Sequence, residues 1–154
     1  MSAKTIVAAS LLAAGTLATA APAQATTETP QSVCGSGFRV VKDGVRTIKE
    51  RKGAELGKVF LLYNRRTGYN CVVTFRTLFH VGHAKVRMGA TLTVQTSTPP
   101  LTSSATASGV YSGHTKPVKL FARGLCVKYS GTIQSPGSAS VGKGGRDKWG
   151  NCGR

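Results

Sequence analysis

Residues 59–76, VFLLYNRRTGYNCVVTFR, decide the fold class of this 154-residue chain. The five apolar residues at 59–63 indicate a strand that is covered on both faces. Residues 64–68 have the composition of a turn, and Gly68 can adopt the positive φ that a tight turn needs. Residues 69–76 then form the return strand of an antiparallel hairpin. Because side chains alternate along a strand, one face of this return strand is expected to be directed toward the core: Tyr69, Cys71, Val73 and Phe75.

Short strands separated by Gly- and Pro-containing turns are predicted along the rest of the chain. Residues 85–94 alternate apolar and polar side chains, which indicates a half-buried strand. Four further strands are predicted, the first two joined by a hairpin turn at Asp43-Gly44: residues 38–41, 45–48, 117–121 and 125–133. No stretch has a sustained helical period. The sequence therefore predicts an all-β fold, a small disulfide-stapled antiparallel β-sandwich or barrel.

The first 25 residues have the features of a cleaved signal peptide. Lys4 supplies the positive charge, residues 6–20 are apolar, and Ala-Gln-Ala at 23–25 fits a cleavage site. No other segment is apolar enough to span a membrane. We therefore expect an exported protein that begins near residue 26.

The exported part is expected to be a flexible leader at 26–33 followed by one β-rich domain at 34–154. Two segments of that domain are predicted to be mobile loops. Residues 95–109 contain eight serines and threonines, two prolines and no charge, and residues 134–146 are rich in glycine and serine.

The exported part contains four cysteines: Cys34, Cys71, Cys126 and Cys152. An even number of cysteines outside the cell indicates two disulfides, for which three pairings exist. We favour Cys34–Cys71 with Cys126–Cys152, because each of these bonds closes a loop within one half of the chain. No Cys-x-x-Cys pair occurs, and the histidines lack zinc-site spacing, so no metal and no cofactor are predicted.

The charge of the chain is strongly positive and unevenly distributed. The formal net charge is +16, and the chain beyond residue 55 contains 14 lysines and arginines but one acid, Asp147. Such a surface attracts polyanions, which favours anionic cell-wall or spore-surface polymers as partners and allows non-specific contact with nucleic acid. That the charge only keeps the protein soluble is the alternative. Two groups are the anion-binding candidates, one at the hairpin tip and one near Trp149: Arg65 and Arg66, and Lys143, Arg146 and Lys148.

Catalytic motifs are absent from the sequence. It has no G-x-S-x-G, H-E-x-x-H or P-loop pattern, and its few carboxylates form no recognisable pair. No catalytic residue is predicted. A ribonuclease-like toxin that uses His80, His83 and His114 is one alternative. A secreted antimicrobial protein and an inhibitor-like protein-binding module are others.

Four segments together resemble the spore-associated protein A family, small secreted proteins of streptomycetes and related actinobacteria. The segments cover most of the exported chain and include all four cysteines: CGSGFRVV at 34–41, FLLYN at 60–64 with TGYNCVVT at 67–74, GLCVKYSGTI at 124–133 and WGNCG at 149–153. The resemblance implies a secreted, β-rich protein associated with spores or the aerial surface, and it supplies no catalytic residues. We therefore expect a basic, non-enzymatic protein that is secreted and associated with the spore or cell surface.

Overall fold

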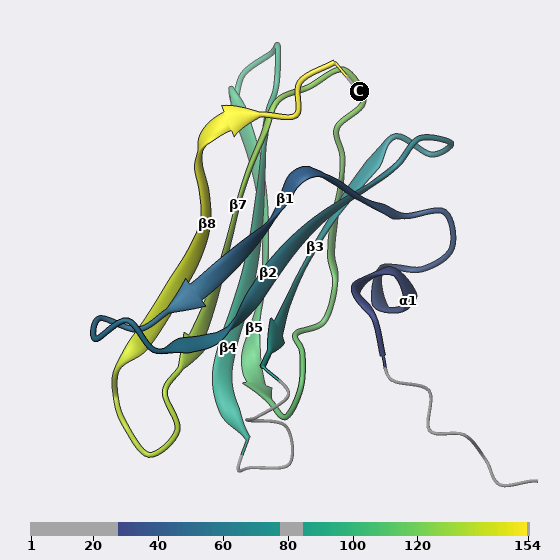
Figure 1. The fold of residues 1–154 in the computed structure, drawn as a ribbon. Coiled ribbons are helices and arrows are strands. Elements are labelled where there is room, and N and C mark those ends of the chain that lie inside the picture. Colours follow the sequence, from purple (N-terminus) through teal and green to yellow (C-terminus); the bar gives the residue numbers. More distant parts are fainter. Residues whose placement is uncertain (1–27, 78–84, 154) are drawn as a thin grey trace, which may run out of the picture.

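The computed structural model describes residues 28–77 and 85–153, and these residues form an almost entirely β structure (Figure 1). In chain order the elements are α1 (Pro30–Cys34), β1 (Arg39–Lys49), β2 (Glu55–Asn64), β3 (Tyr69–Arg76), β4 (Val86–Gln95), β5 (Thr102–Tyr111), β6 (Val118–Phe121), β7 (Val127–Gln134) and β8 (Val141–Gly150). All pairings between strands are antiparallel, in the order β5-β4-β7-β8-β1-β2-β3-β6.

This order folds into two packed layers that together make a nearly closed sandwich. One layer contains β5, β4, β7 and β8, and the other contains β1, β2, β3 and β6. The layers are joined at one corner, where β1 and β8 share a single ladder pair, Lys49 with Lys143. The predicted all-β fold class is confirmed.

The hairpin at 59–76 is also confirmed. Residues 57–64 of β2 pair one-to-one with β3, from Gly57 opposite Arg76 to Asn64 opposite Tyr69. Gly68 in the connecting turn has a φ of 78°, which glycine adopts without steric cost.

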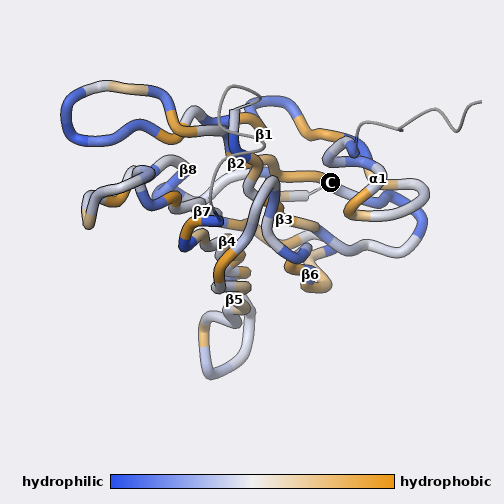
Figure 2. Tube along the Cα trace, turned by 90° about the horizontal axis from the view of Figure 1, so that it is seen from below, coloured by the Kyte–Doolittle hydropathy of each residue, from blue (hydrophilic) through white to orange (hydrophobic). Residues whose placement is uncertain are grey.

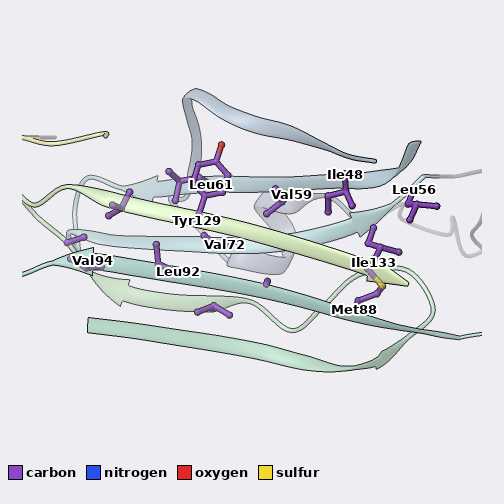
Figure 3. Close-up of a cluster of buried hydrophobic side chains, with 14 of the residues drawn as sticks. Ile48, Leu56, Val59, Leu61, Val72, Met88, Leu92, Val94, Tyr129 and Ile133 are labelled. Atoms are coloured by element: carbon purple, nitrogen blue, oxygen red, sulfur yellow. The ribbon is translucent and has the colours of Figure 1, made fainter. Parts of the chain in front are cut away.

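The main core fills the space between the two layers, where apolar side chains point toward one another (Figure 3). Val59, Leu61 and Val72 contribute from one layer, and Leu92 and Ile133 from the other. The predicted alternation of residues 85–94 is confirmed, because its apolar set is buried: Val86, Met88, Ala90, Leu92 and Val94.

Tyr129 is the polar member of this core. Its hydroxyl donates a hydrogen bond of 2.8 Å to the carbonyl oxygen of Asp43. Burial raises the pKa of the Tyr129 phenol, which favours the neutral form that donates this bond.

A second, smaller apolar cluster lies on the outer side of β2 and β3. Cys34, Phe38, Leu62, Cys71 and Val73 form it, beneath helix α1. The continuous apolar run of β2 is thereby covered on both faces, as its composition predicts. Figure 2 shows apolar colour where β2, β3 and β6 lie together and hydrophilic colour in peripheral turns.

Both predicted disulfides are present. Cys34 is bonded to Cys71, which ties α1 to β3, and Cys126 is bonded to Cys152, which ties the start of β7 to the end of β8. The described residues contain no free cysteine.

The predicted hairpin turn at Asp43-Gly44 is wrong. Residues 38–41 and 45–48 do not pair with each other. Instead, 39–49 form one strand, β1, with an irregularity in its pairing with β2 between Val40 and Val45. Asp43 adopts a φ of 57° within this bulge. An Asp-Gly pair serves a bulge as well as a turn, because both need a residue with positive φ.

Three segments predicted to be irregular contain regular structure. Residues 102–109 of the expected loop at 95–109 belong to β5, and 141–146 of the expected loop at 134–146 belong to β8. The described part of the expected leader at 26–33 includes the start of α1, where Thr29 and Ser32 form a capping box. The predicted signal peptide at 1–25 lies outside the described residues. No helix in the described part of the chain is long and apolar enough to cross a bilayer.

Candidate functional site

Cationic side chains dominate the surface and have few carboxylates to pair with. One ion pair in residues 28–77 and 85–153 joins His114 Nε2 to Glu28 Oε2 at 2.8 Å. Apart from the buried Arg76, no lysine or arginine of these residues lies within 4.0 Å of a carboxylate oxygen. The positive charge is therefore not neutralised by internal pairing, and it is available to a partner.

An open groove of about 750 Å³ lies on the outer face of β4, β7 and β8. We call it the β8 groove. Its lining includes Asp147, three cations and three serine or threonine residues: Lys128, Lys143, Arg146, Thr91, Thr93 and Ser130.

Strand register assembles the β8 groove from residues far apart in sequence. Thr93 lies opposite Lys128, and Thr91 lies opposite Ser130, which in turn lies opposite Gly145. A Cβ atom at Gly145 would lie 2.3 Å from the carbonyl oxygen of Tyr129. Glycine at this position therefore allows the backbones of β7 and β8 to lie close together beside the cations.

Trp149 adds an aromatic ring at the end of β8, next to the β8 groove. The Lys128 ammonium lies 4.3 Å from the centroid of the Trp149 ring, a distance typical of a cation–π contact. The Arg146 guanidinium lies over Gly150, since a Cβ atom there would be 2.3 Å from Arg146 Cζ. The contact with Trp149 orients Lys128, and the position over Gly150 orients Arg146, on the same face of the sheet.

A second groove, of about 360 Å³, lies beside the β2–β3 hairpin tip. We call it the tip groove. Its cations come from β1 and from the turn: Arg39, Lys42, Arg65 and Arg66. Arg123 helps to fix the tip, because its guanidinium donates to the carbonyl oxygens of Arg65 at 3.3 Å and Arg66 at 2.9 Å.

Asn64 holds the tip in shape. Its Oδ1 accepts hydrogen bonds from the main-chain N–H groups of Arg66 at 3.0 Å and Thr67 at 3.2 Å. Its Nδ2 donates to the carbonyl oxygen of Ser36 at 3.1 Å, which connects the tip to the loop before β1. The Asn64 side chain is buried, so these bonds are shielded from water.

Replacing Asn64 by alanine is therefore expected to lower the free energy of unfolding by about 1–3 kcal/mol, because buried donors and acceptors are left without their partner. Chemical denaturation measures this change. Asn64→Asp is the control that keeps the acceptor for Arg66 and Thr67, and it should cost less than Asn64→Ala. Equal destabilisation by the two variants would contradict a dominant role of the two turn bonds.

The sequence-predicted anion-binding residues fall into these two grooves, with one exception. Arg65 and Arg66 line the tip groove, and Lys143 and Arg146 line the β8 groove. Lys148 is exposed on β8 but lines neither groove. Lys128 was missed. The alternation of residues 127–134, which places Lys128 with Ser130 and Thr132 on one face, is the signal that would have identified it.

The prediction that Tyr69 faces the core is wrong. Tyr69 is 41% exposed, and its ring packs edge-on against Phe121 with centroids 5.7 Å apart. Tyr69 is the first residue of β3, beyond the part of the strand that the small cluster covers.

The histidines proposed for nuclease chemistry are described only in part. His80 and His83 lie outside the described residues. His114 stacks on Phe75 with ring centroids 4.9 Å apart, and its Nδ1 lies 2.8 Å from the carbonyl oxygen of Thr115. Its Nε2 contacts Glu28. His114 therefore connects the segment before α1 to the strand region near β3.

No group of three metal-ligating side chains is found in residues 28–77 and 85–153. Within those ranges we identify no residue set that fits a metal ion.

Comparison with known proteins gives one informative match. The chain is 31% identical over 133 residues to Spore-associated protein A of Streptomyces coelicolor, and the match covers 84% of this chain and 77% of that protein. No family model and no solved structure matches the chain.

Proposed function

The chain belongs to the spore-associated protein A family, and we propose from this that it is an exported, non-enzymatic protein of the spore or cell surface. In this proposal it is held there by anionic wall or surface polymers. Lysine and arginine side chains in the β8 groove and the tip groove make the contacts. The match to a protein named for spore association supports the location.

The observation that carries the polymer-binding proposal is the gathering of unpaired cations around two open grooves. Lys128, Lys143 and Arg146 line one groove, and no carboxylate lies within 4.0 Å of any of them in the described part of the chain. Arginine holds a phosphate or carboxylate with two parallel hydrogen bonds, and lysine acts as a point charge. An open groove suits a flexible chain that passes across it, more than a small molecule that must be enclosed.

Two grooves on one molecule also favour a polymer over a single anion. A polymer that contacts the β8 groove is tethered near the molecule, so its contact with the tip groove is effectively intramolecular. Individually weak contacts then add to a firm attachment.

Co-sedimentation of the oxidised protein with purified cell wall and with spores tests this proposal. Binding is expected to weaken steeply with NaCl, because each phosphate that a cation neutralises releases counterions. A variant carrying Lys128→Gln, Lys143→Gln and Arg146→Gln should bind more weakly. Its plot of log affinity against log salt should be shallower by about one unit for each phosphate that the variant no longer neutralises.

The matched control removes three charges elsewhere: Arg51→Gln, Lys52→Gln and Lys58→Gln. These residues are exposed and line neither groove. The control should retain most of the binding. Equal weakening in both variants would contradict the role of the β8 groove, and binding that does not respond to salt would contradict the polyanion proposal itself.

A further inference from the structure

Beyond Arg87, the β4–β5 hairpin is an uncharged part of a strongly basic molecule. Residues 88–115 contain no lysine, arginine, aspartate or glutamate, although the chain carries a formal net charge of +16. Two copies of such a chain repel each other wherever their cations face one another. Residues 88–115 of this hairpin carry no cation of their own that could cause such repulsion.

β5 lies at the end of the strand order and is the most exposed strand of its layer. None of its ten residues is buried, whereas β4 beside it contains six buried residues. No other strand of the described chain pairs with its second edge. Natural proteins usually protect such an edge with lysine, proline or a bulge. β5, with the sequence TSSATASGVY, contains neither residue, and its register with β4 is unbroken.

Two hydrogen bonds at the end of β4 show which main-chain groups face β5. The N–H of Gln95 donates to the carbonyl oxygen of Cys126, on the β7 side, at 2.9 Å. The N–H of the next residue, Thr96, donates to the carbonyl oxygen of Leu101, on the β5 side, at 3.0 Å. In an antiparallel sheet, successive residues of a strand direct their N–H and C=O groups toward opposite neighbouring strands. The even-numbered residues of β4 therefore direct their N–H and C=O groups toward β5.

The partners of these even-numbered residues are odd-numbered residues of β5, such as Ala105 opposite Leu92. Thr91 and Thr106 then form a non-hydrogen-bonded pair, whose side chains approach closely. Their hydroxyl oxygens are indeed 3.0 Å apart. The residues of β5 that direct their N–H and C=O groups away from β4 are consequently the even-numbered ones: Thr102, Ser104, Thr106, Ser108 and Val110.

We propose that this free edge of β5 is a self-association edge, at which a second copy of the chain adds its own β5 in antiparallel orientation. Two identical strands paired in this way are related by a two-fold axis, so one surface serves both copies. The β5-containing layers of the two copies would then form one continuous sheet. The small side chains of serine, threonine and alanine allow close approach of the backbones, and the edge contributes no charge of its own.

A second copy is favoured over an anionic partner because β5 itself, TSSATASGVY, carries no cation that could contact a polyanion. Cations of neighbouring segments lie close to this edge: Arg87 is opposite Val110, and Lys116 and Lys119 line a hollow together with Thr106 and Ser108. Their charge adds a long-range repulsion between copies. Salt screens this repulsion and leaves the main-chain hydrogen bonds in place. Self-association should therefore strengthen with salt, whereas polymer binding under the proposed function should weaken.

Sedimentation velocity of the oxidised protein over a range of concentrations tests the proposal. The dimer fraction should rise between about 0.1 M and 1 M NaCl, over which the Debye length falls from about 10 Å to about 3 Å. Thr106→Pro removes an outward N–H without removing a bond to β4, so it should abolish the dimer. Thr106→Val retains the N–H and should dimerise like the original chain.

A second pair of variants applies if Thr106→Pro lowers the melting temperature strongly. Thr106→Lys places a cation on the edge and should suppress the dimer at low salt more than at high salt. Ser130→Lys adds the same charge on the outer face of β7, away from the edge, and should change the dimer fraction less. A protein that remains monomeric at every concentration in 1 M NaCl would overturn the proposal. So would a dimer that tolerates both Thr106→Pro and Thr106→Lys.

Discussion

A variant with Cys34→Ala and Cys71→Ala is expected to lose about 4 kcal/mol of unfolding free energy, by the chain-entropy estimate for a bond between residues 37 apart. A further decrease is expected because both cysteines are fully buried in the small cluster beneath α1. Alanine leaves a void there, and α1 is no longer covalently attached to β3. Denaturant unfolding of the variant, monitored by circular dichroism, measures the change.

The other disulfide provides the matched control. Cys126 and Cys152 are 26 residues apart, so the same entropy estimate gives a similar value of about 3.5 kcal/mol. However, Cys152 is exposed and Cys126 is only half-buried. The Cys126→Ala, Cys152→Ala variant should therefore be the more stable of the two. A mild reductant should also open Cys126–Cys152 first. The reverse order in either experiment would contradict the role assigned to the small cluster.

Gly131→Val is expected to destabilise the protein by about 3 kcal/mol, the upper part of the usual range for overpacking a core. A Cβ atom at Gly131 would lie 2.5 Å from Thr74 Oγ1, 2.7 Å from Val59 Cβ and 2.9 Å from Ile48 Cδ1. All three neighbours are fully buried, so they have little room to shift. The melting temperature of the variant measures the effect.

Gly113→Val is the control for this substitution. Nothing lies within 4 Å of a Cβ atom built at Gly113, and its φ is outside the positive range. The change should therefore stay within about 0.5 kcal/mol, as for most surface substitutions. If Gly131→Val were equally harmless, the two layers would be more loosely packed around Gly131 than these distances indicate.

The parts of the fold that sequence predicted are those with a strong apolar pattern. The apolar run at 59–63 reflects a strand buried on both faces, and the alternation at 85–94 reflects a strand buried on one face. Both strands are observed. β5 was missed because it lies at the end of a layer. Its side chains are mostly small and none is buried, so its sequence has no apolar alternation from which a strand could be predicted. β8 was missed because a stretch with glycines at 142, 144 and 145 indicates a loop when only the sequence is known. In the structure these glycines lie where neighbouring backbone comes close.

The candidate site was predictable in its charges but not in its geometry. Arg65 and Arg66 were found because a hairpin tip is recognisable from turn residues. Lys128 and Lys143 lie across the β7–β8 pairing, where Thr132 lies opposite Lys143. Without β8 as a strand, no sequence argument places these two cations in one groove. Register is a tertiary property, and it determined which cations face the same hollow.

Neither disulfide connects the two layers. Cys34–Cys71 ties α1 to the layer that contains β3, and Cys126–Cys152 lies within the layer that contains β7 and β8. Between the layers the ladder contributes one pair, and hydrogen bonds from Tyr129 to Asp43 and from Thr74 to Gly89 add to it, so apolar side chains supply most of the remaining contact. The attraction between these side chains exists because the surrounding medium is water. Each layer is thus reinforced covalently, whereas contact between the layers depends mainly on hydrophobic packing. Cold or denaturing cosolvents, which weaken hydrophobic association, are therefore expected to act mainly on the contact between the layers.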